Sequence, residues 1–334
     1  GAGMPGDDPS AEEAQEEAET GIQGAEPPRE STLTVAGLAD RAVGARAIRT
    51  LVAGAIDYAG LFPPAALSMR DAVRNYAAYH DGADAWALGR FVVPVARLGE
   101  FRENAASLTH SAEPAWRLSA LAGPGGADDW RAVERSGLIG VVADAFELRV
   151  RGPEDIRAAA ARLPTGLDVF YEIPIDADPG DLLAALATVG GRAKVRTGGV
   201  TADAFPSVGD LARFIVACAR SAIPFKATAG LHHPLRATYR LNYDAASPRG
   251  DMFGFLNVLL AAAFAREGLG ADDVADLLAE RDPSAFQFTA DGVAWRSRSV
   301  GIHALGETRG SLALSFGSCS FTEPLEELAA LGLL

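Results

Sequence analysis

The stretch Pro224-Phe-Lys-Ala-Thr-Ala-Gly-Leu-His-His-Pro234 has the pattern of a short buried strand whose far end opens into a loop. A helical segment, Val208 to Arg220, precedes it, and a long irregular stretch follows. Lys226 lies in the apolar part. A buried ammonium group must be paired or neutral, because an isolated one costs several kcal/mol to desolvate. Lys226 is therefore either held by a neighbouring carboxylate or a candidate nucleophile or base.

The same alternation of apolar strand, loop and helix repeats before this stretch. Six strand-like runs start about 25 to 32 residues apart, which leaves room for one helix and two short loops. They are Arg90 to Val95, Leu118 to Leu121, Ala143 to Val150, Asp168 to Pro174, Ala193 to Thr197 and Phe225 to Thr228. Repeated βα units of this length predict a parallel sheet with right-handed crossovers.

Two topologies fit such a repeat, an open doubly wound sheet and a closed (β/α)8 barrel. No GxGxxG follows the first strand, so the usual dinucleotide mark of the open form is missing. Ala285 to Thr289 and Leu312 to Phe316 bring the strands to eight, and a capped helix starting at Thr322 follows. We therefore predict an α/β fold, a TIM-like (β/α)8 barrel over residues 87–334.

The residues before the barrel divide into two parts. Residues 36–86 indicate an N-terminal helical extension packed on the barrel, with helical spacing from Leu38 to Ala59 that Pro63 and Pro64 break. Residues 1–35 are expected to form a disordered acidic tail, because so polar a segment cannot bury enough apolar surface to order itself. Gly1 to Gly3, before Met4, are interpreted as residues added by cloning.

The amino-acid composition limits the kinds of molecule that the protein can bind. The net charge of -14 disfavours binding to nucleic acid or to an anionic membrane. We find no signal peptide and no apolar run long enough to span a bilayer. Cys218 and Cys319 form neither a disulfide framework nor a CxxC metal pattern. The expectation is a cytoplasmic protein with a small anionic substrate as its partner, and a homo-oligomer stays open.

Charged side chains lie late in four successive predicted strands. In a (β/α)8 barrel, functional groups gather at the carboxyl ends of the strands. Residues two apart on a strand share a face, and charges are cheaper inside the mouth, where they neutralise one another, than against the outer helices. The set is Glu147 and Arg149, Glu172, Lys194 and Arg196, and Lys226 and Thr228. It is either a catalytic site or a structural ion-pair network.

Small residues and arginines near these strand ends predict an anion site. Glycines after a strand let backbone N–H groups approach a phosphate or carboxylate, although a tight turn explains them equally well. A second small-residue loop, Ser315 to Ser320, precedes a helix N-terminus, and the long stretch Leu235 to Gly250 has the length of a lid. The expected substrate-binding residues are Arg196, Gly198, Gly199, Thr228, Gly230, Arg149, Arg236 and Ser318.

His232 and His233 support a second interpretation, a divalent metal whose shell Glu147 and Glu172 complete. Neighbouring residues of a strand point to opposite faces, so both histidines can bind one ion only if the chain has already turned into a loop. Pro234 favours such a turn. Without a metal, His232 would act as a catalytic acid or base or contact the substrate.

Two resemblances rest on these residues. The blocks Asp57-Tyr-Ala-Gly-Leu-Phe-Pro-Pro64, Phe225-Lys-Ala-Thr-Ala-Gly-Leu-His-His-Pro234 and Ser315-Phe-Gly-Ser-Cys-Ser-Phe321 resemble those of a bacterial family of hypothetical proteins, which implies no activity. Phe225-Lys-Ala-Thr-Ala-Gly230 also resembles the strand of deoxyribose-phosphate aldolases that holds the Schiff-base lysine. Lys194-Val-Arg-Thr-Gly-Gly199 is similar to their second lysine strand, with the order of the two strands reversed. This second resemblance implies a class I aldolase-like (β/α)8 barrel.

We therefore predict a lyase or isomerase of the aldolase kind that acts on a small anionic carbonyl compound. Lys226 attacks or deprotonates that compound, Lys194 lowers the pKa of Lys226 by like-charge proximity, and Glu172 or Glu147 relays protons. This chemistry requires no cofactor. The alternatives are a metal-dependent enzyme that uses His232, His233 and the two glutamates with a divalent metal, and a non-catalytic binding or scaffold barrel.

Overall fold

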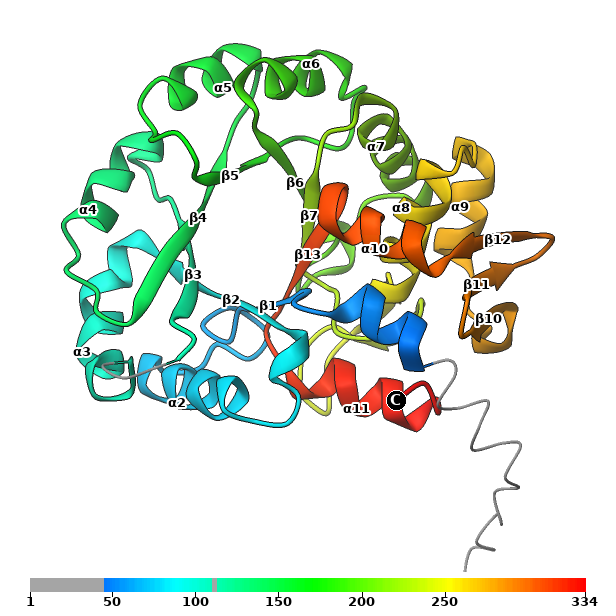
Figure 1. Ribbon diagram of the computed structural model, residues 1–334, viewed down its shortest axis with the longest axis horizontal. Coiled ribbons are helices and arrows are strands. Elements are labelled where there is room, and N and C mark those ends of the chain that lie inside the picture. Colours follow the sequence, from blue (N-terminus) through cyan, green and yellow to red (C-terminus); the bar gives the residue numbers. More distant parts are fainter. Residues whose placement is uncertain (1–44, 110–112) are drawn as a thin grey trace, which may run out of the picture. The chain divides into compact units, whose positions relative to one another are not determined.

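Eight parallel strands form a closed barrel, and helices lie around its outside (Figure 1). The computed structural model describes residues 45–109 and 113–334, so the acidic tail predicted for residues 1–35 lies outside the described part. Around the barrel the order is β1 (Ile56–Tyr58), β13 (Ala313–Ser318), β7 (Phe225–Thr228), β6 (Arg192–Arg196), β5 (Asp168–Glu172), β4 (Val141–Arg149), β3 (Trp116–Leu121) and β2 (Leu88–Pro94). The predicted TIM-like (β/α)8 fold is confirmed.

Two segments differ from their predicted places. β1 lies within residues 36–86, the expected helical extension, and pairs with both β13 and β2, so the barrel begins before residue 87. Ala285 to Thr289, predicted as the seventh barrel strand, instead contains β10 (Phe286–Thr289) of a separate antiparallel sheet. β1 has no sequence periodicity that marks a strand, because all three of its residues are buried. β10 alternates between buried and more exposed residues, as expected for a strand of an antiparallel sheet with one covered face.

Helices connect successive strands of the barrel. Residues 45–52 are helical and precede β1. α2 (Met69–His80) begins after Ser68, whose hydroxyl accepts a hydrogen bond from the backbone N–H of Asp71 at 3.1 Å and so caps the helix. The others along the chain are α3 (Leu98–Thr109), α4 (Trp130–Glu134), α5 (Pro153–Ala160), α6 (Gly180–Val189) and α7 (Val208–Ser221), and α11 (Thr322–Ala330) follows β13.

A long excursion separates β7 from β13. It contains the antiparallel hairpin of β8 (Ala237–Arg240) and β9 (Arg249–Met252), which replaces the irregular stretch expected there. It continues with α8 (Phe255–Arg266), α9 (Ala271–Ala279), the sheet of β10, β11 (Gly292–Trp295) and β12 (Arg298–Gly301), and α10 (Ile302–Ser311). α8 is apolar on all sides because it packs against α7, α9, α10 and β13. Across the described ranges, no helix combines the length and apolar character needed to cross a bilayer.

The inside of the barrel differs in chemistry from the layer between strands and helices. Apolar side chains fill that outer layer, and many of them are completely buried. Several strands also place a polar or charged side chain at a buried position, and these residues are Asp57, Arg90, Ser119, Glu147, Lys194, Lys226, Ser315 and Ser318. Buried charges require partners, so their pairing determines what this interior can do.

Candidate active site

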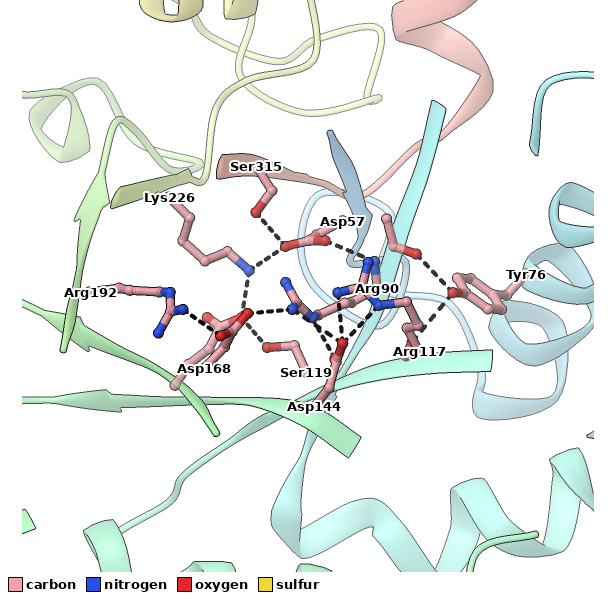
Figure 2. Close-up of polar contacts among 12 residues, drawn as sticks. Asp57, Tyr76, Arg90, Arg117, Ser119, Asp144, Asp168, Arg192, Lys226 and Ser315 are labelled. Carbon is pink, nitrogen blue, oxygen red and sulfur yellow. Dashed lines mark hydrogen bonds and ion pairs between the residues drawn. The ribbon is translucent and has the colours of Figure 1, made fainter. Parts of the chain in front are cut away.

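Lys226, on β7, is buried between two carboxylates. Its Nζ lies 2.6 Å from Oδ2 of Asp57 on β1 and 2.7 Å from Oε1 of Glu147 on β4. Figure 2 shows Asp57 between Lys226 and Ser315, whose hydroxyl donates to the same Oδ2 at 2.8 Å. The side chain of Lys226 is only 1% exposed. Its ammonium group therefore has the two anionic partners that compensate its desolvation.

Lys194, on the adjacent strand β6, repeats this arrangement. It is the Cα partner of Lys226 in the register of β6 with β7. Its Nζ lies 2.8 Å from Oε2 of Glu147 and 2.9 Å from Oε2 of Glu172 on β5. The hydroxyl of Ser119 donates to Oε1 of Glu147 at 2.7 Å. Glu147 thus bridges the two ammonium groups, one with each carboxylate oxygen.

Electrostatics hold this cluster in its charged forms. Burial alone would raise the pKa of Glu147, but Lys194 and Lys226 outweigh it and hold that pKa well below its ordinary value. Burial alone would lower the pKa of Lys226, but Asp57 and Glu147 outweigh it and raise that pKa. The prediction that Lys194 lowers the pKa of Lys226 is wrong, because the carboxylate of Glu147 lies between the two ammonium groups.

A cavity of about 210 Å³ opens at the carboxyl ends of the strands, beside these lysines. Lys194, Lys226 and Glu147 form part of its wall. The wall also contains Arg196, Gly199, Thr228, Gly230, His232 and Cys319, together with the apolar Phe62, Pro63, Pro64, Val92, Leu121 and Val200. A largely apolar cavity with a few convergent polar groups is typical of a small-molecule site.

The expected anion-binding residues reach the cavity only in part. Arg196, Gly199, Thr228 and Gly230 line it. Gly198 does not, because it packs on the ring of Phe205, where a Cβ atom would lie 2.4 Å from a ring carbon. The glycine at position 198 is therefore required by close packing.

Three further residues predicted to bind substrate have other partners. The side chain of Arg149 is 76% exposed and pairs with Glu172 at 2.9 Å. The guanidinium of Arg236 lies over the ring of Phe253, 4.7 Å from its centroid. Ser318 lies at the end of β13 and not in a loop, and its hydroxyl is 3.5 Å from Nδ1 of His232. None of the three lines the cavity.

The two adjacent histidines face different surroundings. His232 lies in the cavity wall, with its Nδ1 3.6 Å from Sγ of Cys319. Burial, with a smaller contribution from His233, lowers the pKa of His232 to about 4, so its imidazole is neutral at pH 7. His233 points elsewhere, with its Nδ1 2.6 Å from Oε1 of Glu327 on α11.

The four residues predicted as a metal site do not come together. Glu147 and Glu172 bind Lys194, and Glu147 also binds Lys226. His233 contacts Glu327 instead. Within the described residues, His232, His233, Glu147 and Glu172 form no common ligand group, because the side chains of consecutive residues diverge.

A second charged layer lies toward the amino ends of the same strands (Figure 2). Arg90 donates to Asp144 through Nε at 2.6 Å and to Asp168 through Nη2 at 2.8 Å. The backbone N–H of Arg90 also donates to Oδ1 of Asp57 at 2.8 Å, which joins this layer to Lys226. The remaining cations are Arg117, paired with Asp144, and Arg192, paired with Asp168. Every cation of this layer is an arginine.

Two further features of the sequence point to this site. The run Ala55-Ile56-Asp57-Tyr58 places an acid among apolar residues, and Asp57 proves to be a partner of Lys226. Composition gives the stronger signal. Of the 30 basic residues in the sequence, Lys194 and Lys226 are the only two lysines. Both are at the cavity.

Comparisons with protein-family models and with curated proteins find no match to this chain. The fold and the site define a (β/α)8 barrel with a lysine-containing cavity at the carboxyl ends of its strands.

Proposed function

We propose that this barrel is a lyase or isomerase of the aldolase kind, which acts on a small anionic carbonyl compound through a strand-end lysine. The observation that supports it is the position of the only two lysines of the chain, side by side at one cavity. The charged layer at the amino end uses arginine throughout. A guanidinium forms ion pairs but is always charged, whereas a lysine can also act as nucleophile or base.

The surroundings of the two lysines suggest different roles. Lys226 is 1% exposed and its pKa is raised by Asp57 and Glu147 against the effect of burial, so it suits a fixed cation that stabilises negative charge on the substrate. Lys194 is 4% exposed. Its second partner, Glu172, is the last residue of β5, so this pair lies at the carboxyl end of the strand, where the cavity opens. We therefore assign the nucleophile to Lys194, the reverse of the roles expected from the sequence.

The glutamates beside Lys194 can accept and return the proton that imine formation requires. The Lys194 ammonium group passes a proton to Glu147 or Glu172, and the neutral amine adds to the carbonyl carbon. The glutamic acid formed in this way returns its proton to the carbinolamine hydroxyl, which leaves as water, and the product is a protonated imine with the positive charge on the nitrogen. The carboxylates that pair with the ammonium group also stabilise this iminium. His232, neutral and in the cavity wall, suits proton transfer at the carbon next to the imine.

The cavity wall also suits an anionic substituent. Arg196 and Thr228 line the cavity, together with the backbone at Gly199 and Gly230. A guanidinium forms charge-assisted hydrogen bonds to carboxylate or phosphate. The volume of about 210 Å³ limits the substrate to a small molecule.

Cys218 and Cys319 are free thiols, which fits the reducing cytoplasm that we propose as the compartment.

The alternatives fit this arrangement less well. A metal held by His232, His233, Glu147 and Glu172 would require both glutamates to leave their lysines. A scaffold barrel needs ion pairs inside, but arginine supplies these at the amino end and would serve equally well at the carboxyl end. The choice of lysine at positions 194 and 226 favours chemistry.

Borohydride trapping tests the proposal. The native protein is incubated with a panel of small aldehydes and ketones that bear a carboxylate or phosphate, reduced, digested and mapped by mass. Because the chain has only two lysines, any side-chain adduct is assigned directly. We expect one adduct per chain, on Lys194, and none after omission of borohydride or of the carbonyl compound.

Matched variants separate the two lysines. Lys194→Arg and Lys226→Arg each keep a positive charge but cannot form an imine, and circular dichroism checks that each is folded. Lys194→Arg should abolish the adduct, whereas Lys226→Arg should retain it. An adduct on Lys226 instead would restore the roles expected from the sequence. No adduct with any member of the panel would contradict the covalent mechanism.

A further inference from the structure

A group of potential metal ligands lies outside the lysine site. His233, Glu323 and Glu327 each offer one ligand atom, and these three atoms lie within 4.8 Å of one another. The two glutamates are four residues apart on α11, so they lie on one face of that helix. His233 belongs to the segment after β7. Ligands from two distant parts of the chain therefore converge.

Neighbouring aromatic side chains orient these ligands. The ring of His233 stacks on the ring of Tyr239 with 3.5 Å between centroids and 13° between planes. Nδ1 of His233 lies 2.6 Å from Oε1 of Glu327. The hydroxyl of Tyr243 donates to Oε2 of Glu323 at 3.2 Å. The contacts of Tyr239 and Tyr243, which are not ligands themselves, are of the kind that fixes ligand orientation at metal sites.

The group has an excess of negative charge. His233 is the one side chain that pairs with Glu327, and neither glutamate forms an ion pair with a lysine or arginine in the part of the chain that the structure describes. A bound cation would compensate this negative charge.

A second cavity gives the group an open side. Its volume is about 330 Å³, and His233 and Glu323 line it. Tyr239 and Tyr243 also line this cavity, as do Arg240, Asn242 and Arg249. His232 and Pro64 line this cavity and also the lysine cavity. Water or a small ligand could therefore complete the shell of an ion.

We propose that His233, Glu323 and Glu327 bind a divalent transition-metal ion, either Zn²⁺ or Mn²⁺. One imidazole and two carboxylates suit these ions, and three protein ligands leave positions open toward the second cavity. The ring nitrogen of His233 that binds the ion must be deprotonated, so binding releases any proton held there. This inference is independent of the lysine chemistry. The ion would also fix the loop that holds His232, one residue before its ligand.

Metal titration tests this inference. Tag-free protein, dialysed against a chelator, is titrated with Zn²⁺ by calorimetry and with Mn²⁺ by electron paramagnetic resonance. We expect one ion per chain. Glu323→Gln and Glu327→Gln should each weaken binding by more than the roughly 10- to 100-fold that loss of an outer-shell partner costs. Tyr243→Phe, which leaves all three ligands in place, should weaken it by about tenfold.

Glu326 provides the matched control. It is an exposed glutamate on the same helix and is not a member of the ligand group. Glu326→Gln removes the same charge and should leave the affinity unchanged. Absence of binding at micromolar Zn²⁺ and Mn²⁺, or equal losses in all three glutamate variants, would overturn the proposal. If a ligand variant fails to fold, Tyr243→Phe decides, because an unchanged affinity in that variant also counts against the site.

Discussion

Glu147 is the residue on which the lysine cluster depends. Its two oxygens serve different ammonium groups, and Ser119 binds one of them as well. Without its charge, Lys194 and Lys226 would share the interior with one carboxylate each, Glu172 and Asp57. Breaking a buried pair is far more costly than breaking an exposed one, because the remaining charge stays desolvated.

We expect Glu147→Gln to lower the free energy of unfolding by about 3 to 5 kcal/mol, the range for a broken buried pair. Urea denaturation measures the change. Glu154→Gln is the control, because Glu154 also forms an ion pair, with Arg157, but its side chain is 87% exposed. That variant should lose no more than about 1 kcal/mol. Equal losses would contradict the role given to Glu147.

The depressed pKa of Glu147 predicts a specific dependence of stability on pH. Lys194 and Lys226 outweigh burial and hold this pKa below its unfolded value of about 4.3. The stabilisation is therefore complete above that value and is lost as pH falls from it toward the folded pKa. Urea midpoints between neutral pH and strongly acid pH should fall more steeply in the wild type than in Glu147→Gln. Parallel curves would show that Glu147 contributes nothing to acid sensitivity.

The junction after β7 shows how an element's end is constrained. Gly230 has φ +74°, and a Cβ atom there would lie 2.9 Å from the ring of Phe205 and 3.1 Å from Cα of Gly198. Gly198 packs on the same ring. The glycines that the sequence associates with an anion thus also allow the ends of β6 and β7 to meet Phe205.

We expect Gly230→Ala to destabilise the protein by about 1 to 3 kcal/mol, because it adds strain at positive φ to a steric clash. Gly268 is the matched control, since its φ is +93° and nothing lies within 4 Å of its would-be Cβ. Gly268→Ala should show the backbone strain alone and therefore a smaller loss. Thermal melts of both variants provide the comparison, and a larger loss at Gly268 would contradict the packing argument.

Prediction from sequence succeeded where apolar runs recur at regular spacing between helical segments. The six runs from Arg90 to Thr228 are barrel strands. They can be recognised in the sequence because each is clearly apolar and lies between helical segments. β1 was missed since three fully buried residues give no periodicity, and β10 was misplaced since pattern alone does not reveal which sheet a strand joins. In the site, Glu147, Glu172, Lys194 and Lys226 were predicted to meet and do so. Asp57 was missed along with its strand.

The scarcity of lysine among the basic residues allows a test of whether the barrel unfolds as one unit. Lys194 and Lys226 are 4% and 1% exposed, and the chain has no other lysine. A bulky amine reagent should therefore leave both side chains unmodified in the native protein and modify them only on unfolding. Mass spectrometry at increasing urea should follow the same transition as circular dichroism. Modification of either lysine before that transition would indicate local opening of the barrel.

The closing pair of strands has a consequence for synthesis on the ribosome. β1 and β13 are neighbours in the barrel although they lie near opposite ends of the described chain, and Ser315 binds Asp57 across that seam. Until residues 313–318 have left the exit tunnel, the nascent chain can contain both lysines and all three of their carboxylate partners but no closed ring to hold them. The cavity is therefore completed only after β13 has been synthesised, and a chain released before β13 would expose charges that the folded barrel conceals.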